Sequence, residues 1–106
     1  MFVAKVIGQV VATKKESSLQ GRRLVMLRPL LVDPADPAKF RDGANTIVAV
    51  DTMGAGTGEV VLFVQGSSAR QVTGLKGVPV DASVVGIVDS VKVLGKSTYQ
   101  SSSSNG

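Results

Sequence analysis

The chain has 106 residues, a formal net charge of +4 and a sequence pI of about 9.8, so a single mildly basic domain is expected. It contains no cysteine and no histidine. Disulfides, thiolate metal sites, cysteine nucleophiles and a Ser-His-Asp triad are therefore excluded. The commonest general base and the commonest catalytic metal ligand are missing as well.

No apolar run reaches the roughly 18 residues that a membrane-spanning helix needs. The first residues also lack the basic stretch followed by an apolar stretch that marks a signal peptide. A soluble intracellular protein without a membrane partner is therefore expected.

Valine is the commonest residue and the chain holds 12 glycines, a composition that favours β-strands joined by tight turns. Five strands are predicted. The first covers residues 2–13, whose side chains alternate between two faces, and Gly8 in its middle indicates a bend or bulge. The second covers about 24–32, where Pro29 indicates an edge or a bulge because it cannot donate to a ladder. The other three strands are predicted over 45–51, 59–65 and about 83–94.

The segments between these strands carry turn-forming residues. A polar loop is expected over 14–23. A second loop is expected over 33–44, which contains two Asp-Pro pairs and one Asp-Gly pair. Residues 66–71 are predicted to form one helical turn, with Ser67 or Ser68 as its N-cap.

A further turn is expected over 74–79, and the Ser-rich residues 97–106 are predicted to form a disordered tail. Residues 1–96 then make up the only domain. Its predicted class is all-β: a small, partly closed five-stranded β-barrel with one or two short helical turns.

The strands predicted over 24–32, 59–65 and 83–94 are apolar on both faces. A single small barrel has only one interior, so the second apolar face of these strands needs a cover. Because helix is scarce, a neighbouring copy of the chain is the expected cover, which predicts an obligate oligomer. The alternative is that the loops 14–23 and 33–44 fold over this face.

A glycine loop follows the third strand, with the sequence Gly54-Ala55-Gly56-Thr57-Gly58-Glu59. A dinucleotide-binding loop would need a small residue at the position of Glu59 and a helix after it, and a Walker A loop would need a Gly-Lys-Ser/Thr sequence. Neither pattern is present. The loop is therefore interpreted as a tight strand connection with positive φ angles or close backbone packing.

A basic segment accounts for the whole net charge, because five cations face one acid, Glu16, within fifteen residues. One interpretation is phosphate contact by a nucleic-acid-binding barrel. Single-strand binders of this fold stack bases on aromatic side chains, however, and residues 3–39 contain none. A solvated loop, or a rim that meets an acidic neighbouring protein, is the favoured alternative. The five cations are Lys14, Lys15, Arg22, Arg23 and Arg28.

No constellation of residues predicts catalysis or metal binding. The carboxylates of Asp51, Glu59, Asp81 and Asp89 are dispersed and lack the spacing of a metal-binding loop. Asp51 and Asp81 border turns, where an aspartate typically bonds its own backbone. The Ser67-Ser68 pair has no base at a recognised spacing. A non-enzyme without cofactor or metal is therefore predicted.

Four motifs, read in order, resemble the EutN/CcmL family of vertex proteins of bacterial microcompartment shells, over about residues 1–94. They are Ile7-Gly8-Gln9-Val10-Val11-Ala12-Thr13-Lys14-Lys15 with Leu19 and Gly21; Val48-Ala49-Val50-Asp51 leading into the glycine loop; Gly66-Ser67-Ser68-Ala69-Arg70; and Pro79-Val80-Asp81-Ala82 continuing through Val84-Val85-Gly86-Ile87-Val88-Asp89. Residues 33–44 match no family motif, so the compartment type is left open.

This resemblance implies a barrel of OB-like topology that forms a homopentamer. Such pentamers cap the five-fold vertices of a carboxysome-like polyhedral shell in the cytoplasm, beside hexameric shell proteins, and carry no catalytic residues. An OB-type nucleic-acid-binding module remains the alternative from a different class. A scaffold of a cytoplasmic enzyme complex is hard to separate from the first interpretation.

The resemblance also suggests which residues meet neighbouring proteins. Small residues allow close approach of two backbones, and an arginine can bond a carboxylate bidentately across an interface. The basic segment is expected to meet hexameric shell proteins. The candidate subunit-interface residues are Gly54, Ala55, Gly56, Gly58, Glu59, Ser67, Ser68, Arg70 and Asp81.

Overall fold

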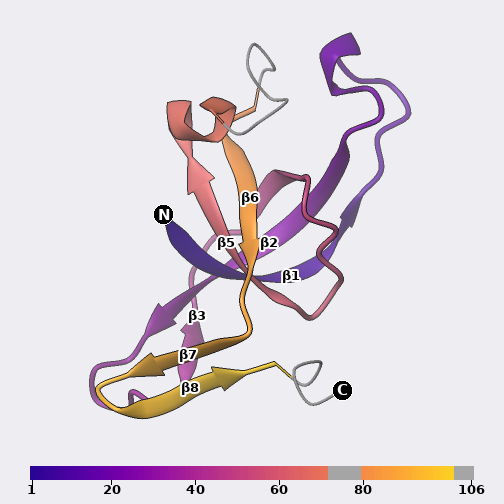
Figure 1. Cartoon of the computed structure of the whole chain (residues 1–106). Coiled ribbons are helices and arrows are strands. Elements are labelled where there is room, and N and C mark those ends of the chain that lie inside the picture. The colour runs from indigo at the N-terminus through magenta and orange to yellow at the C-terminus, as the bar shows by residue number, and fades with distance from the viewer. Residues whose placement is uncertain (72–79, 102–106) are drawn as a thin grey trace.

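The computed structural model describes residues 1–71 and 80–101 (Figure 1). Eight strands and two 3-10 turns are found in these two segments. The strands are β1 (Phe2–Val10), β2 (Arg23–Val32), β3 (Phe40–Asp42), β4 (Ile47–Asp51), β5 (Val60–Gln65), β6 (Ala82–Ile87), β7 (Ser90–Val93) and β8 (Lys96–Gln100), and the turns are η1 (Ser17–Leu19) and η2 (Gly66–Gln71).

Five of the strands close into a barrel. The order around it is β1-β5-β6-β4-β2, and the β1–β2 pairing completes the ring. Every pairing is antiparallel except that of β4 with β6, which is parallel. This closed five-stranded arrangement confirms the all-β, OB-like barrel expected from the sequence.

The barrel interior is filled by side chains that alternate along each strand, because successive residues of a strand point to opposite faces. Phe63 is the largest fully buried side chain. Most of the other members of this core are small or β-branched, which suits the narrow interior of a five-stranded barrel. The core comprises Ala4, Val6, Val25, Leu27, Ala49, Ala55, Val61, Phe63, Ala82 and Val84.

Two irregularities expected from glycine and proline are present. The β1–β2 register shifts between Val6 and Gly8, which is the predicted bulge. Pro29 lies where β2 leaves β4, whose pairing ends at Leu27. The carbonyl oxygen of Pro29 accepts a hydrogen bond from the N–H of Gly43 at 2.7 Å, at the start of the β2–β3 hairpin.

The C-terminal region differs from its prediction. The strand expected over 83–94 is interrupted after Ile87 and resumes as β7. The expected tail is wrong for residues 97–100, which lie in β8 and pair with β7. The reason is local: Leu94 and Gly95 both have positive φ angles and form a two-residue turn that reverses the chain.

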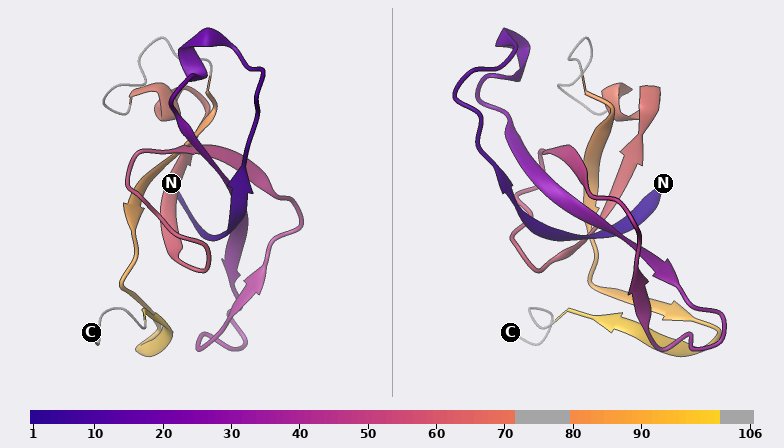
Figure 2. Two further views of the ribbon diagram at one scale, coloured as in Figure 1. Left: turned by 90° about the vertical axis from the view of Figure 1, so that its right-hand side faces the viewer. Right: turned by 180° about the vertical axis from the view of Figure 1, so that it is seen from behind.

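The loop expected over 33–44 likewise contains a short strand, β3, paired with the end of β2. The turn expected over 74–79 and the last residues of the expected tail, 102–106, lie outside the described residues. The β2–β3 and β7–β8 hairpins project from the same end of the barrel (Figures 1 and 2), where the hydroxyl of Thr98 donates a hydrogen bond to the carbonyl oxygen of Pro37.

Candidate functional site

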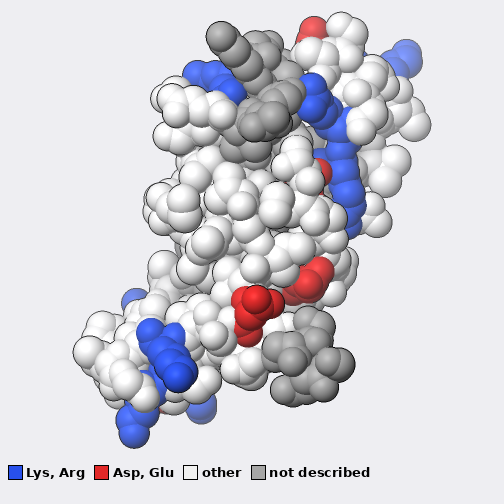
Figure 3. Space-filling model, in the orientation of Figure 1, with Lys and Arg blue, Asp and Glu red and all other residues white. Residues whose placement is uncertain are grey.

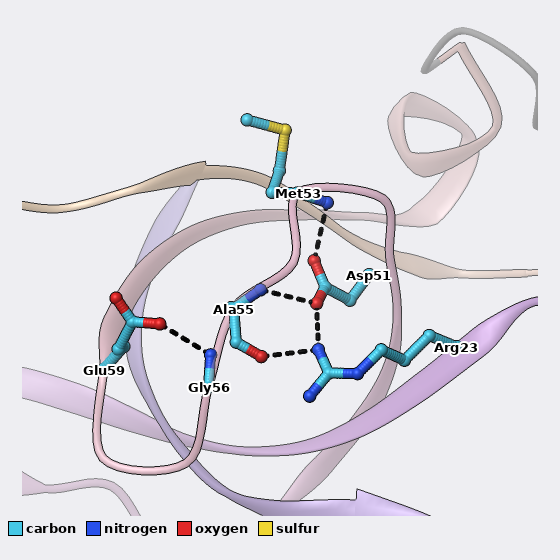
Figure 4. A network of polar contacts seen from close by, with 6 residues as sticks. All are labelled: Arg23, Asp51, Met53, Ala55, Gly56 and Glu59. Carbon is cyan, nitrogen blue, oxygen red and sulfur yellow. Dashed lines mark hydrogen bonds and ion pairs between the residues drawn. The ribbon is translucent and has the colours of Figure 1, made fainter.

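Asp51, the last residue of β4, is the buried centre of a polar network (Figure 4). Its Oδ1 accepts a hydrogen bond from the N–H of Met53 and its Oδ2 one from the N–H of Ala55, both at 2.8 Å. Oδ2 also forms an ion pair with Nη1 of Arg23, which donates to the carbonyl oxygen of Ala55. Three donors therefore offset the burial of this carboxylate.

This network confirms that Asp51 bonds the backbone of the turn that follows it. The ion pair of Arg23 with Asp51 was not predicted from the sequence, because it depends on the pairing of two strands. Arg23 of β2 lies directly opposite Asp51 of β4 in the antiparallel register. The guanidinium is therefore bound within the chain, and its side chain is only 34% exposed.

The glycine loop that leads from Asp51 to β5 is a tight connection, as expected. Gly54 and Gly58 have φ angles of 79° and 94°, which favour glycine. The carboxylate of Glu59 accepts a hydrogen bond from the N–H of Gly56 at 2.6 Å. The loop is also tied to β1, because Gly58 donates to the carbonyl oxygen of Val6 at 2.8 Å and Val6 donates to that of Glu59 at 2.9 Å.

The loop therefore uses its own carboxylates where a phosphate-binding loop would present open N–H groups. The N–H groups of Met53, Ala55 and Gly56 are bonded to Asp51 or Glu59 (Figure 4). The side chain of Ala55 is fully buried in the barrel core. Of the loop residues expected to meet another subunit, Gly54 and Gly58 are exposed and Ala55 is not.

The other predicted interface residues gather at the end of β5. Residues 66–71 form the 3-10 turn η2, which confirms the predicted helical turn. The predicted N-cap is wrong, because the turn begins at Gly66 and both Ser67 and Ser68 lie inside it. Ser67, Ser68, Arg70 and Asp81 are exposed. Nη1 of Arg70 donates to the carbonyl oxygen of Val80 at 3.2 Å, so this arginine links η2 to the residues before β6.

The cations of the basic segment have different surroundings. Lys14 is exposed, whereas Lys15 and Arg28 are half-buried. Nε of Arg22 donates to the carbonyl oxygen of Ser18 at 3.5 Å. On the face drawn in Figure 3, lysine and arginine side chains form a column along one edge of the barrel. Arg23 differs from the other four, since it is paired with a buried carboxylate.

Apolar side chains remain exposed outside the barrel core. Leu31 and Val48 are each 45% exposed, and Phe2 is 51% exposed. The alternative of cover by the loop 14–23 is realised only in part, because Leu19 packs against a small outer cluster around Val50. The single chain therefore leaves apolar side chains of β1, β2 and β4 exposed to solvent.

Apolar hollows lie among the described residues, and two of them concern the exposed side chains named above. One has a volume of about 210 Å³ and is lined by Leu19, Leu24, Val48, Val50, Val80, Asp81 and Ala82. The other has a volume of about 430 Å³ and is lined mainly by Phe2, Pro29, Leu31, Ile47 and Phe63. Within residues 1–71 and 80–101, no group of three acidic side chains is placed to hold a metal ion. In the same part of the chain no helix is long and apolar enough to cross a membrane.

These features define a class of protein. It is a small OB-like barrel in which a buried carboxylate and its arginine partner hold a glycine loop in place, and in which apolar side chains on the outside of the barrel remain exposed. The sequence profile of the family described as "Ethanolamine utilisation protein EutN/carboxysome" matches residues 1–89. The chain belongs to this EutN/CcmL family, as its motifs indicated.

Two members of the family illustrate the likeness. The bacterial microcompartment shell vertex protein GrpN of Rhodospirillum rubrum is 46% identical over 94 residues, which cover 89% of this chain and 99% of GrpN. The carboxysome shell vertex protein CcmL of Gloeobacter violaceus is 40% identical over 99 residues, which cover 93% of each chain.

The fold is similar to the solved structures of the same two proteins. The CcmL structure superposes with a TM-score of 0.82 at 41% identity, covering 94% of this chain and 97% of CcmL. The structure described as the GrpN pentameric microcompartment shell protein superposes with a TM-score of 0.72 at 39% identity, covering 89% of this chain and 99% of GrpN.

Proposed function

We propose that this chain is a structural shell protein whose pentamers cap the five-fold vertices of a bacterial microcompartment. The family relationship supports this function, since GrpN and CcmL are named as shell vertex proteins and GrpN as a pentamer. The protein then acts by shape rather than by catalysis. Its partners are further copies of itself and the hexameric shell proteins around each vertex, and its location is the shell.

The observation that carries this proposal is the uncovered apolar surface of a chain in this family. Each subunit of a closed ring gives one surface to one neighbour and a different surface to the other neighbour. A five-fold ring therefore covers two different patches on every barrel. Leu31 and Val48 line separate hollows, and both are half-exposed in the single chain. None of these observations favours the nucleic-acid-binding alternative.

The exposed residues of the site have proposed places in this assembly. Gly54 and Gly58 allow a neighbouring backbone to approach the loop closely, because neither carries a side chain. Ser67, Ser68 and Arg70 present hydroxyl and guanidinium donors from η2. The basic segment is assigned to the rim that meets the hexamers. Arg23 is the exception, since its ion pair with Asp51 stabilises the glycine loop inside the subunit.

The native mass tests this function most directly. Light scattering with a refractive-index detector suits the chain, which has no tryptophan and one tyrosine. The expected mass is about 55 kDa, five times the chain mass of 10.9 kDa, at both low and high salt. A monomer or dimer at micromolar concentration, or a complex that releases nucleic acid as salt rises, would contradict the proposal.

A second experiment tests the vertex role itself. Co-expression with a hexameric shell protein is expected to give closed polyhedral particles in electron micrographs, because pentamers add curvature to a hexagonal sheet. Omission of this chain is the matched control and is expected to give open sheets or tubes. Identical particles with and without the chain would show that it does not close the shell.

A further inference from the structure

The β7–β8 hairpin is a structural element apart from the barrel. Its two strands form a separate two-stranded sheet. It projects from the end of the barrel opposite to η1 and η2 (Figure 1). An isolated two-stranded hairpin is only marginally stable in water, so packing against another protein surface would stabilise it. The family profile ends at residue 89, immediately before it.

The tip of this hairpin carries an apolar side chain at an unfavourable backbone position. Leu94 has a φ angle of 51°, and it is the only residue other than glycine with a positive φ among the described residues. It is also 79% exposed. Asparagine suits such a turn better than leucine does. Strain at an exposed apolar residue points to a contact that the single chain lacks.

Two cations flank this leucine. Lys92 and Lys96 lie in the two strands next to the turn, and both are exposed. Figure 3 shows lysine and arginine side chains gathered at this end of the molecule. The hairpin therefore presents an apolar knob with positive charge on either side.

The smaller of the two hollows has the complementary character. Leu24, Val48, Val50 and Val80 provide an apolar lining, and the exposed Asp81 contributes the one carboxylate among the lining residues. Its volume of about 210 Å³ exceeds the roughly 150 Å³ of an apolar cavity that accepts benzene, so a leucine side chain fits. Among the described residues, none that lines the larger hollow is charged.

We propose that Leu94 of each subunit inserts into the smaller hollow of the next copy of the chain, with Lys92 and Lys96 facing its Asp81. This inference rests on the proposed pentamer and assigns one of its contacts. The β7–β8 hairpin lies at the end of the molecule opposite to η1 (Figure 1), whereas Leu19 of η1 and Ala82 at the start of β6 line the smaller hollow. A contact between two such unlike surfaces is what a closed ring requires. The opposite charges favour this hollow over the larger one.

Leu94→Asn tests the knob without weakening the hairpin. The Asn-Gly pair is a preferred two-residue turn, so the hairpin itself is expected to gain stability. Loss of the buried leucine is expected to raise the protomer concentration at which the pentamer dissociates by about tenfold to a hundredfold. Val11→Asn is the matched control, because Val11 is 86% exposed and lies in neither hollow.

Cross-linking identifies the hollow that receives the knob. The natural chain has no cysteine, so engineered pairs have no background. Leu94→Cys combined with Val48→Cys is expected to give covalent oligomers of up to five chains under mild oxidation on a non-reducing gel. Leu94→Cys combined with Leu31→Cys probes the larger hollow and is expected to remain uncross-linked.

These outcomes separate this inference from the proposed function. A parent chain that is not pentameric would overturn both. A pentameric parent with an unchanged dissociation concentration for Leu94→Asn would overturn only the knob contact. Cross-linking through Leu31→Cys instead of Val48→Cys would overturn the assignment of the smaller hollow. Restored assembly when Asp81→Lys is combined with Lys92→Glu and Lys96→Glu would support the charge pairing.

Discussion

Replacement of Asp51 by alanine removes the centre of the network that holds the glycine loop. Three donors lose their acceptor at once: the N–H groups of Met53 and Ala55 and the guanidinium of Arg23. The carboxylate itself is fully buried, so water cannot take its place without opening the loop. The destabilisation should therefore be much larger than that of an average surface substitution.

The magnitude follows from these contacts. Breaking a buried ion pair by removing one partner costs about 3–5 kcal/mol. The lower end applies here, because Arg23 is 34% exposed and regains water when its partner is lost. We expect about 3 kcal/mol for Asp51→Ala. Arg23→Ala should cost only about 1–2 kcal/mol, because two backbone N–H groups still satisfy the buried carboxylate of Asp51.

Urea denaturation followed by far-ultraviolet circular dichroism measures the free energy of unfolding of these variants. All variants should be compared at one protomer concentration, since assembly adds to the apparent stability. Asp89→Ala is the matched control, because it removes an exposed carboxylate and should change the free energy by less than about 0.5 kcal/mol. A change for Asp51→Ala no larger than that of this control, or a larger loss of stability for Arg23→Ala than for Asp51→Ala, would contradict the prediction.

Three further predictions concern the glycine loop, Glu16 at the N-cap of η1, and Arg70 of η2. Gly58→Ala should lower the free energy of unfolding by about 1–2 kcal/mol, because Gly58 has a φ angle of 94°. Gly56→Ala should lower it less, since the added Cβ meets only a carboxylate oxygen of Glu59, at 3.3 Å. Equal losses for the two variants would contradict this prediction. The pKa of Glu16 lies below its ordinary value of 4.5, because the hydroxyl and then the N–H of Ser18 donate to its carboxylate. The stability that the Glu16 cap contributes is therefore present above the ordinary pKa and is lost as the pH falls through the lowered pKa. Ser18→Ala should raise the pKa of Glu16, measured by NMR titration. An unchanged pKa would contradict the cap. Arg70→Ala should raise the concentration at which the pentamer dissociates, measured by light scattering, and a mass that persists on dilution as in the parent would remove its interface role.

Several features of the fold follow from local sequence. The valine-rich segments predict all five barrel strands, although the fifth prediction runs past the end of β6 at Ile87, and Gly8 and Pro29 mark irregularities that the structure contains. The glycine loop was correctly interpreted as a tight connection, because its residues lack the pattern of a phosphate-binding loop and its neighbour Glu59 supplies a carboxylate. Such signals depend on residues a few positions apart, so they can be read without the fold.

The network at Asp51 depends on the fold, because strand register brings Arg23 opposite a residue 28 positions later in the chain. The β7–β8 hairpin was not predicted, because a serine-rich composition indicates disorder. In the structure, Leu94 and Gly95 have positive φ angles and form a turn that brings residues 96–100 back alongside β7. The sequence by itself determined the all-β class and the excess of apolar surface. Only the tertiary structure decided which side chains are buried in pairs and which remain open to a neighbour, since pairing and burial depend on residues distant in the chain.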